Sequence, residues 1–223
     1  MGDPVGSTQR FYTRWARLYD LAAVHTPGIG SLRRAAVARF DPQPGETVVE
    51  MGCGSGANLP LLRDRVGPEG RVIGVDVSPG VLSIANARVG RRGWANVHVV
   101  RGDTSRPLVD EAVDCVFASL VVGMFDNPAA VVDEWAALVG SGGRVGLLDL
   151  ARSSHPRARL LNGLFRRFVT TANPQSVRQS TAPLRMLDRR VAAAHRRLHE
   201  RCSDAETDRR AFGFARASGG TVD

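Results

Sequence analysis

The chain has 223 residues, a mass of 24.0 kDa and a formal net charge of +8 at pH 7. Its hydrophobic fraction of 43% exceeds that of disordered chains, so we expect one folded domain. The chain lacks both a long apolar run and a charged-then-apolar leader, which predicts a cytosolic protein without a transmembrane helix. Three widely spaced cysteines (Cys53, Cys115 and Cys202) indicate neither a disulfide framework nor a metal site.

The basic residues are unusual because the sequence contains no lysine, so all 30 are arginines. Guanidinium groups bind phosphate and carboxylate in a bidentate manner, which makes an anionic partner such as RNA or phospholipid one interpretation. The other interpretation is a GC-rich genome that encodes arginine in place of lysine. We favour the second, because the arginines are scattered along most of the chain, although they are densest between Arg152 and Arg210.

The predicted elements begin with two helical patterns within residues 8–40, separated by a proline–glycine break. From residue 46, short apolar segments alternate with helical patterns, which predicts a parallel sheet with helices on both faces. The expected strands are 47–51, 71–75, 97–100, 113–118 and 144–148, and the expected helices are 57–66, 79–90 and 128–139.

Beyond residue 150 we expect an amphipathic helix, a second helix over about 183–200 and a weak last edge strand near 210–218. A final antiparallel hairpin is poorly indicated between Cys202 and Ser218. The predicted fold is α/β, a doubly wound, mostly parallel sheet in a single domain. It comprises an N-terminal helical cap (8–40), a core (41–150), and C-terminal helices with an edge strand (151–223).

A glycine-rich turn, EMGCGSGANL from Glu50 to Leu59, follows the first predicted strand. Its glycines let the backbone turn sharply and approach a ligand closely. The helix that follows offers free amide donors to a carboxylate. Asp76 ends the next predicted strand, where it can accept hydrogen bonds from both hydroxyls of a ribose.

The same turn loosely fits a dinucleotide fingerprint, with Ala57 in the third position. Glu50 would crowd a pyrophosphate, but it can serve the ammonium group of a sulfonium cofactor. Gly56 completes a GxGxG pattern with Gly52 and Gly54. Asp103 is a second acidic residue, directly after the third predicted strand. There is no Tyr-x-x-x-Lys pair, and without lysine that dehydrogenase chemistry is excluded.

Together these residues resemble the class I methyltransferases, particularly the quinone and phospholipid methyltransferase families, over about residues 8–150. The resemblance implies S-adenosylmethionine as cofactor and S-adenosylhomocysteine as product. It assigns the methionine moiety to Glu50 and the glycines, the ribose to Asp76 and the adenine amino group to Asp103. It also places Val77 beside adenine and Thr104 at its edge.

The segment YTRWARLYD, residues 12–20, resembles a cap element of these families, and packing on the sheet is its alternative role. The expected cofactor-binding residues are Tyr12, Tyr19, Glu50, Gly52, Gly54, Gly56, Asn58, Leu59, Asp76, Val77, Asp103, Thr104, Ser119 and Leu120.

Methyl transfer needs mainly positioning and desolvation, so a dedicated base is optional and no catalytic residue is assigned. Residues 118–125 lack an N-P-P-Y element and predict either a hydrophobic acceptor pocket or a buried strand end. His25 is a weak candidate base, and the later histidines, His195 among them, are expected to be solvated. Asp149 is expected either to cap a turn, which we favour, or to orient an acceptor.

The basic amphipathic stretch 157–167 predicts either a cover helix or an interfacial helix at anionic lipid headgroups. We therefore predict a methyltransferase for a small or lipid-like acceptor, with peripheral contact to an anionic membrane in the second case. The alternatives are an RNA methyltransferase, an NAD(P)-dependent oxidoreductase and a non-catalytic cofactor-binding subunit.

Overall fold

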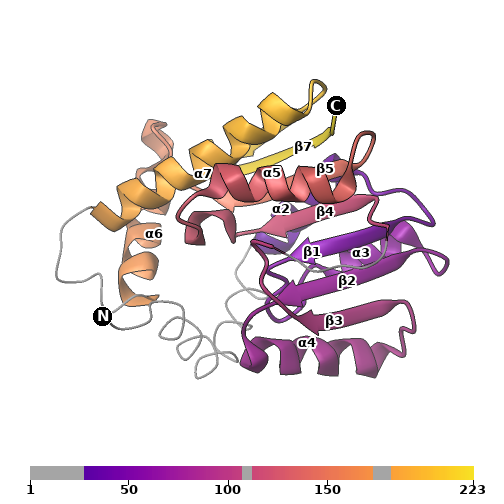
Figure 1. Cartoon of the computed structure of the whole chain (residues 1–223). Coiled ribbons are helices and arrows are strands. Elements are labelled where there is room, and N and C mark those ends of the chain that lie inside the picture. The colour runs from indigo at the N-terminus through magenta and orange to yellow at the C-terminus, as the bar shows by residue number, and fades with distance from the viewer. Residues whose placement is uncertain (1–27, 107–111, 173–181) are drawn as a thin grey trace, which may run out of the picture.

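The computed structural model describes residues 28–106, 112–172 and 182–223, which form a sheet with helices on both faces (Figure 1). The seven strands lie in the order β3-β2-β1-β4-β5-β7-β6. β1 to β5 pair in parallel, and β7 runs antiparallel to both neighbours. The strands are β1 (Thr47–Met51), β2 (Arg71–Asp76), β3 (Val97–Arg101), β4 (Cys115–Ser119), β5 (Arg144–Leu150), β6 (Glu206–Arg210) and β7 (Ala215–Thr221).

The helices divide between the two faces of the sheet because successive strand side chains point to opposite sides. On one face, Val48 and Phe117 pack with α2, α3 and α4. On the other, Met51 and Leu147 pack with α5 and α7, where Trp135 is fully buried. The helices are α2 (Ile29–Phe40), α3 (Leu59–Val66), α4 (Pro79–Arg92), α5 (Pro128–Val139), α6 (Arg159–Ala172) and α7 (Ala182–Arg201).

Prolines and glycines in the sequence set the ends of the central helices. α4 begins at Pro79 and α5 at Pro128, where a missing N–H costs no helical hydrogen bond. Asn127 caps α5 by accepting a hydrogen bond from the Ala130 amide at 3.3 Å. α4 stops at Gly93, whose φ of 63° few other residues adopt without strain. These signals confirm the predicted helices to within a few residues.

The five predicted parallel strands are confirmed, but the prediction of a last edge strand is wrong. β6 and β7 form the hairpin that the sequence indicated poorly, and β7 lies inside the sheet between β5 and β6. Small residues build β7 because its neighbours leave little room. A Cβ on Gly219 would lie 3.3 Å from the Phe40 Cα of α2, and one on Gly220 2.7 Å from the Cys202 Cβ.

His195 of α7 is buried, which contradicts the expectation that it is solvated. Its Nε2 lies 3.2 Å from the Asp149 Oδ2 of β5, and its Nδ1 lies 2.7 Å from the Ser218 Oγ of β7. Ser218 in turn contacts Thr207 of β6 at 2.6 Å. Asp149 is therefore not an exposed turn cap but part of a polar chain that joins α7 to three strands.

No helix within the three described ranges is long and apolar enough to cross a membrane. Of the expected N-terminal helical segment, only α2 falls within these ranges.

Candidate cofactor site

The loop between β1 and α3 turns on three glycines with positive φ, 70° at Gly52, 55° at Gly54 and 75° at Gly56. The Gly52 and Cys53 amides both donate to the Val75 carbonyl of β2, at 2.9 and 3.0 Å. A Cβ on Gly52 would lie 2.8 Å from the Val121 Cγ2, so glycine is required there by both conformation and space.

Parallel pairing brings the other expected site residues to the same edge of the sheet as this loop. Met51 of β1 lies opposite Val75 of β2 and Ala118 of β4. The residues that follow each of these, including Asp76 and Ser119, therefore gather at the carboxyl ends of the strands. Open α/β sheets bind their ligands at this edge, where the strand order reverses.

Asp76 fixes the glycine loop from the end of β2. Its Oδ2 accepts a hydrogen bond from the Gly54 amide and its Oδ1 one from the Ser78 amide, each at 2.9 Å. Burial raises the pKa of the Asp76 carboxyl, and the amide hydrogen bonds from Ser78 and Gly54 oppose that rise. Each carboxylate oxygen can accept a second hydrogen bond, so Asp76 can hold the loop and bind two further donors.

Glu50 is fully buried beneath the loop, and its Oε1 accepts a hydrogen bond from the Asn58 amide nitrogen at 2.6 Å. Burial raises the pKa of Glu50 to about 8, while the Asn58 hydrogen bond and the charge of Arg33 act against the rise. The carboxyl is therefore largely protonated at neutral pH in the absence of a cationic partner.

Several buried polar atoms around the loop have no hydrogen-bond partner in the part of the chain that the structure describes. They are the Glu50 Oε2, the Ser55 Oγ, the Asn58 Oδ1 and the Ser119 Oγ. Buried polar atoms are rarely left unpaired, because each costs about 1–3 kcal/mol. A polar ligand with both donors and acceptors would satisfy these atoms, so the residues fit the methionine portion of S-adenosylmethionine.

Asp103 and Thr104 follow β3 at the same edge but differ in exposure. The exposed Asp103 carboxylate accepts hydrogen bonds from the Ser105 amide at 2.8 Å and from its hydroxyl at 2.7 Å. The Thr104 carbonyl accepts one from the Trp135 indole at 2.8 Å, which anchors this loop to α5. Thr104 itself is buried.

The turn after β4 places Ser119 and Leu120 across from the glycine loop. Leu120 adopts a φ of 62°, a left-handed conformation that is strained for a branched residue, and its amide donates to the Leu148 carbonyl at 2.7 Å. Val121 and Val122, which come next, are buried against Gly52 and in the α7-side core. This part of the expected acceptor segment is therefore core, while Met124 is half exposed.

The remaining residues expected at the site add little evidence about cofactor binding. Val77 is half-buried, and the Leu59 side chain is fully buried in the core under the loop. Tyr12, Tyr19 and His25 lie outside the described residues.

Two arginines near Glu50 were missed by the sequence reasoning. Arg33 of α2 is only 6% exposed and acts electrostatically on Glu50. Arg88 of α4 does so more weakly, and its Nη1 donates to the Ser55 carbonyl at 2.5 Å. No signal singled them out, because a chain with 30 basic residues, all arginine, offers many equivalent candidates.

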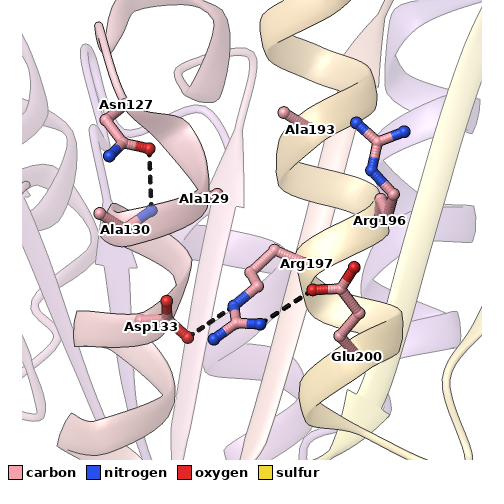
Figure 2. A pocket seen from close by; sticks show the side chains of 8 residues that line it. All are labelled: Asn127, Ala129, Ala130, Asp133, Ala193, Arg196, Arg197 and Glu200. Carbon is pink, nitrogen blue, oxygen red and sulfur yellow. Dashed lines mark hydrogen bonds and ion pairs between the residues drawn. The ribbon is translucent and has the colours of Figure 1, made fainter.

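A separate groove of about 390 Å³ lies between α5 and α7 (Figure 2). Figure 2 shows Arg197 reaching from α7 to Asp133 of α5 and to Glu200, with both hydrogen bonds at 2.8 Å. None of the expected cofactor residues lines this groove. It is therefore distinct from the glycine-loop site.

Comparison with known proteins identifies methyltransferases as relatives of this chain. A family model described as a methyltransferase domain matches residues 49–147. A phosphatidylethanolamine N-methyltransferase of Cereibacter sphaeroides is 33% identical over 163 residues, which cover 72% of this chain and 76% of that protein. A demethylmenaquinone methyltransferase of Corynebacterium kroppenstedtii is 32% identical over 168 residues, or 74% and 68% of the two chains.

Other relatives are longer. The chain spans 29% of an arsenite methyltransferase of Halobacterium salinarum and 48% of a nocamycin O-methyltransferase of Saccharothrix syringae. Among solved structures, a SAM-dependent methyltransferase from Aquifex aeolicus shares the fold with a TM-score of 0.59 at 18% identity, covering 89% of this chain and 94% of that one. The chain belongs to the class I methyltransferases, whose cofactor is S-adenosylmethionine.

Proposed function

We propose that this protein transfers a methyl group from S-adenosylmethionine to a small or lipid-like acceptor and releases S-adenosylhomocysteine. The observation that carries the proposal is the buried Glu50–Asn58 pair with unpaired polar atoms, set beside a glycine loop that Asp76 holds in place. When bound, the cofactor supplies a methyl carbon that its positively charged sulfur activates toward displacement.

The roles we propose for individual residues follow from their positions. Glu50 and Asn58 face the amino-acid end of the cofactor, and the amino terminus of α3 favours its carboxylate. Asp76 accepts hydrogen bonds from the ribose hydroxyls. Asp103 and Thr104 bind the adenine edge.

Five further residues complete the proposed site. Val77 flanks the adenine, and Ser119 and Leu120 border the reacting end. Tyr12 and Tyr19 cap the cofactor. This role remains a prediction from the sequence alone.

Bound S-adenosylmethionine would supply the methyl group to an acceptor atom, and the electron pair of the bond that breaks would stay on its sulfur. The protein's part is to align the two reactants and to exclude water. The strained turn at Leu120 and the rigid contact of Val121 with Gly52 keep the end of β4 fixed beside the loop. A dedicated base is not required for an acceptor that is already a good nucleophile.

A lipid-like acceptor is supported by two relatives that this chain matches over more than two thirds of their own length. Their names refer to phosphatidylethanolamine and demethylmenaquinone, two hydrophobic molecules of different chemistry. Peripheral contact with an anionic membrane is part of this proposal, because such acceptors reside in bilayers.

Calorimetric titration with S-adenosylmethionine, S-adenosylhomocysteine and NADH tests the cofactor assignment. Binding of the two sulfur ligands alone is expected, and binding of NADH alone would refute it. Transfer of a labelled methyl group to phosphatidylethanolamine, to demethylmenaquinone and to RNA then tests the acceptor class. Labelling of RNA alone would favour the RNA methyltransferase alternative, and cofactor binding without transfer to any acceptor would favour the non-catalytic one.

A further inference from the structure

The outer face of α6 is apolar and exposed. Leu160 and Leu164 lie one turn apart and are 74% and 59% exposed. The opposite face is tied to the body of the protein. Asn162 bonds both backbone groups of Ser153, at 3.0 and 2.8 Å, and the Phe165 ring packs edge-on against Phe214 of the β6–β7 turn with centroids 5.0 Å apart. The two leucines therefore point away from the protein.

The segment of the chain that carries these leucines is basic. Residues 150–187 contain seven arginines and no aspartate or glutamate. Arg159, Arg166 and Arg167 join Leu160, Gly163 and Leu164 in lining an open hollow of about 610 Å³ along the helix. Such a surface suits a partner that presents both anionic groups and apolar chains.

A second exposed apolar residue lies in the same region. Phe212, in the turn between β6 and β7, is 50% exposed and stacks on the His155 ring with centroids 5.3 Å apart. The Ser153 hydroxyl also donates to the Phe212 carbonyl, which joins this turn to the segment that precedes α6. Leu150 at the carboxyl end of β5 pairs with Ala215, so the turn lies at the same edge of the sheet as the glycine loop.

We propose that the outer face of α6, together with Phe212, docks on an anionic lipid bilayer. The leucines enter the boundary between headgroups and acyl chains, and the arginines contact lipid phosphates. Nucleic acid fits this surface less well, because exposed aliphatic side chains gain nothing from a phosphate backbone. This inference rests on the proposed function. It names the surface through which the protein would reach a lipid-like acceptor.

Vesicle sedimentation tests the proposal on the whole chain without cofactor or acceptor, so its outcome is independent of methyl transfer. The protein is expected to sediment with phosphatidylcholine vesicles that contain phosphatidylglycerol, and less so with phosphatidylcholine alone or at high salt. Leu160→Ser with Leu164→Ser should lower the partition coefficient about tenfold. Arg159→Gln with Arg166→Gln should lower it about fivefold for each arginine.

The matched control is Arg91→Gln with Arg196→Gln, which removes the same charge from exposed positions on α4 and α7. It should change the partition coefficient less than about twofold. An equal loss of vesicle binding in the control would show that binding depends only on the net charge of the protein, and it would overturn the proposed surface. So would a wild-type protein that shows no preference for anionic vesicles, or one that binds single-stranded RNA while leaving vesicles in solution. Unchanged thermal midpoints and cofactor affinities confirm that the variants are folded.

Discussion

Two buried carboxyl groups on opposite faces of the sheet show how the cofactor half and the C-terminal half of the molecule differ. Burial raises the pKa of both Glu50 and Asp149. Asp149 has a partner in the protein, the His195 imidazole, which is itself held by Ser218. Glu50 has one amide partner and one oxygen without any in the described part of the chain. A buried acid that is paired within the protein has its hydrogen bonds satisfied by the fold, whereas one left partly unpaired marks a place for a ligand.

The largest effect is expected on the cofactor side, from Asp76→Ala. The change removes two proposed ribose hydrogen bonds and the acceptor that holds the Gly54 amide. Each charged hydrogen bond contributes about 1.5–3 kcal/mol, so the dissociation constant for S-adenosylhomocysteine should rise at least about 100-fold. Calorimetry measures it, and wild-type affinity would show that the cofactor binds elsewhere.

Glu50→Gln should have opposite effects on the stability of the ligand-free protein and on its affinity for S-adenosylmethionine. The folded-state pKa is raised from 4.5 to about 8, so the stability that this group contributes is complete below pH 4.5 and is lost as pH rises through about 8. Glutamine avoids that loss, so the variant should be more stable without ligand by on the order of 4 kcal/mol at pH 8. Urea unfolding at several pH values measures the difference.

The same substitution should weaken binding of S-adenosylmethionine. In the wild type, an ammonium group beside Glu50 favours the ionised form, so affinity should increase with pH up to about 8 and binding should release a proton at neutral pH. Titration in buffers of different ionisation enthalpy detects that proton. If the affinity of the variant keeps the pH dependence of the wild type, a group other than Glu50 is responsible for that dependence.

On the C-terminal side, His195→Ala should cost stability and leave cofactor affinity unchanged. The substitution removes the imidazole that contacts the fully buried Asp149 carboxyl. It also removes the hydrogen-bond partner of the Ser218 hydroxyl. A loss of about 2–3 kcal/mol in the free energy of unfolding is expected. His199→Ala is the control, because that exposed side chain contacts only Thr207 among the described hydrogen-bond partners. A large loss of cofactor affinity in His195→Ala would break the distinction between the two halves.

The smallest effect is expected from Asp103→Ala. Its carboxylate is exposed and already accepts two hydrogen bonds from Ser105, so water competes for any contact with adenine. The dissociation constant for S-adenosylhomocysteine should rise about fivefold. A loss as large as that of Asp76→Ala would mean that the adenine contact contributes as much to affinity as the ribose contact.

The parallel part of the fold was predictable because its signals are local. Strands such as β1 and β4 are buried on both faces and consist mostly of apolar residues, and prolines mark the helices that follow. β7 has no such signal. Its glycines are required by the close approach of Cys202 and of Phe40, and Phe40 lies far away along the chain.

The candidate site divides in the same way. The glycines and acids follow strand ends at recognisable spacing, so Gly52, Asp76 and Asp103 could be found before their positions were known. Burial of His195 was not predicted from the sequence, because Arg196 and Arg197 follow it directly and α7 as a whole is rich in arginine. Only the position of α7 against β5 and β7 shows that one narrow face of the helix turns inward.

The place of β7 also has a consequence for the order in which the protein assembles. Six of the seven strands are synthesised before β7, yet β7 fills the position between β5 and β6. Until residues 215–221 have been made, β5 presents a row of unpaired backbone groups, flanked by Val145, Leu147 and Leu148. An open apolar edge of this kind recruits strands from other chains. A chain that ends before Ala215 would therefore keep this apolar edge open and be prone to pair with other chains.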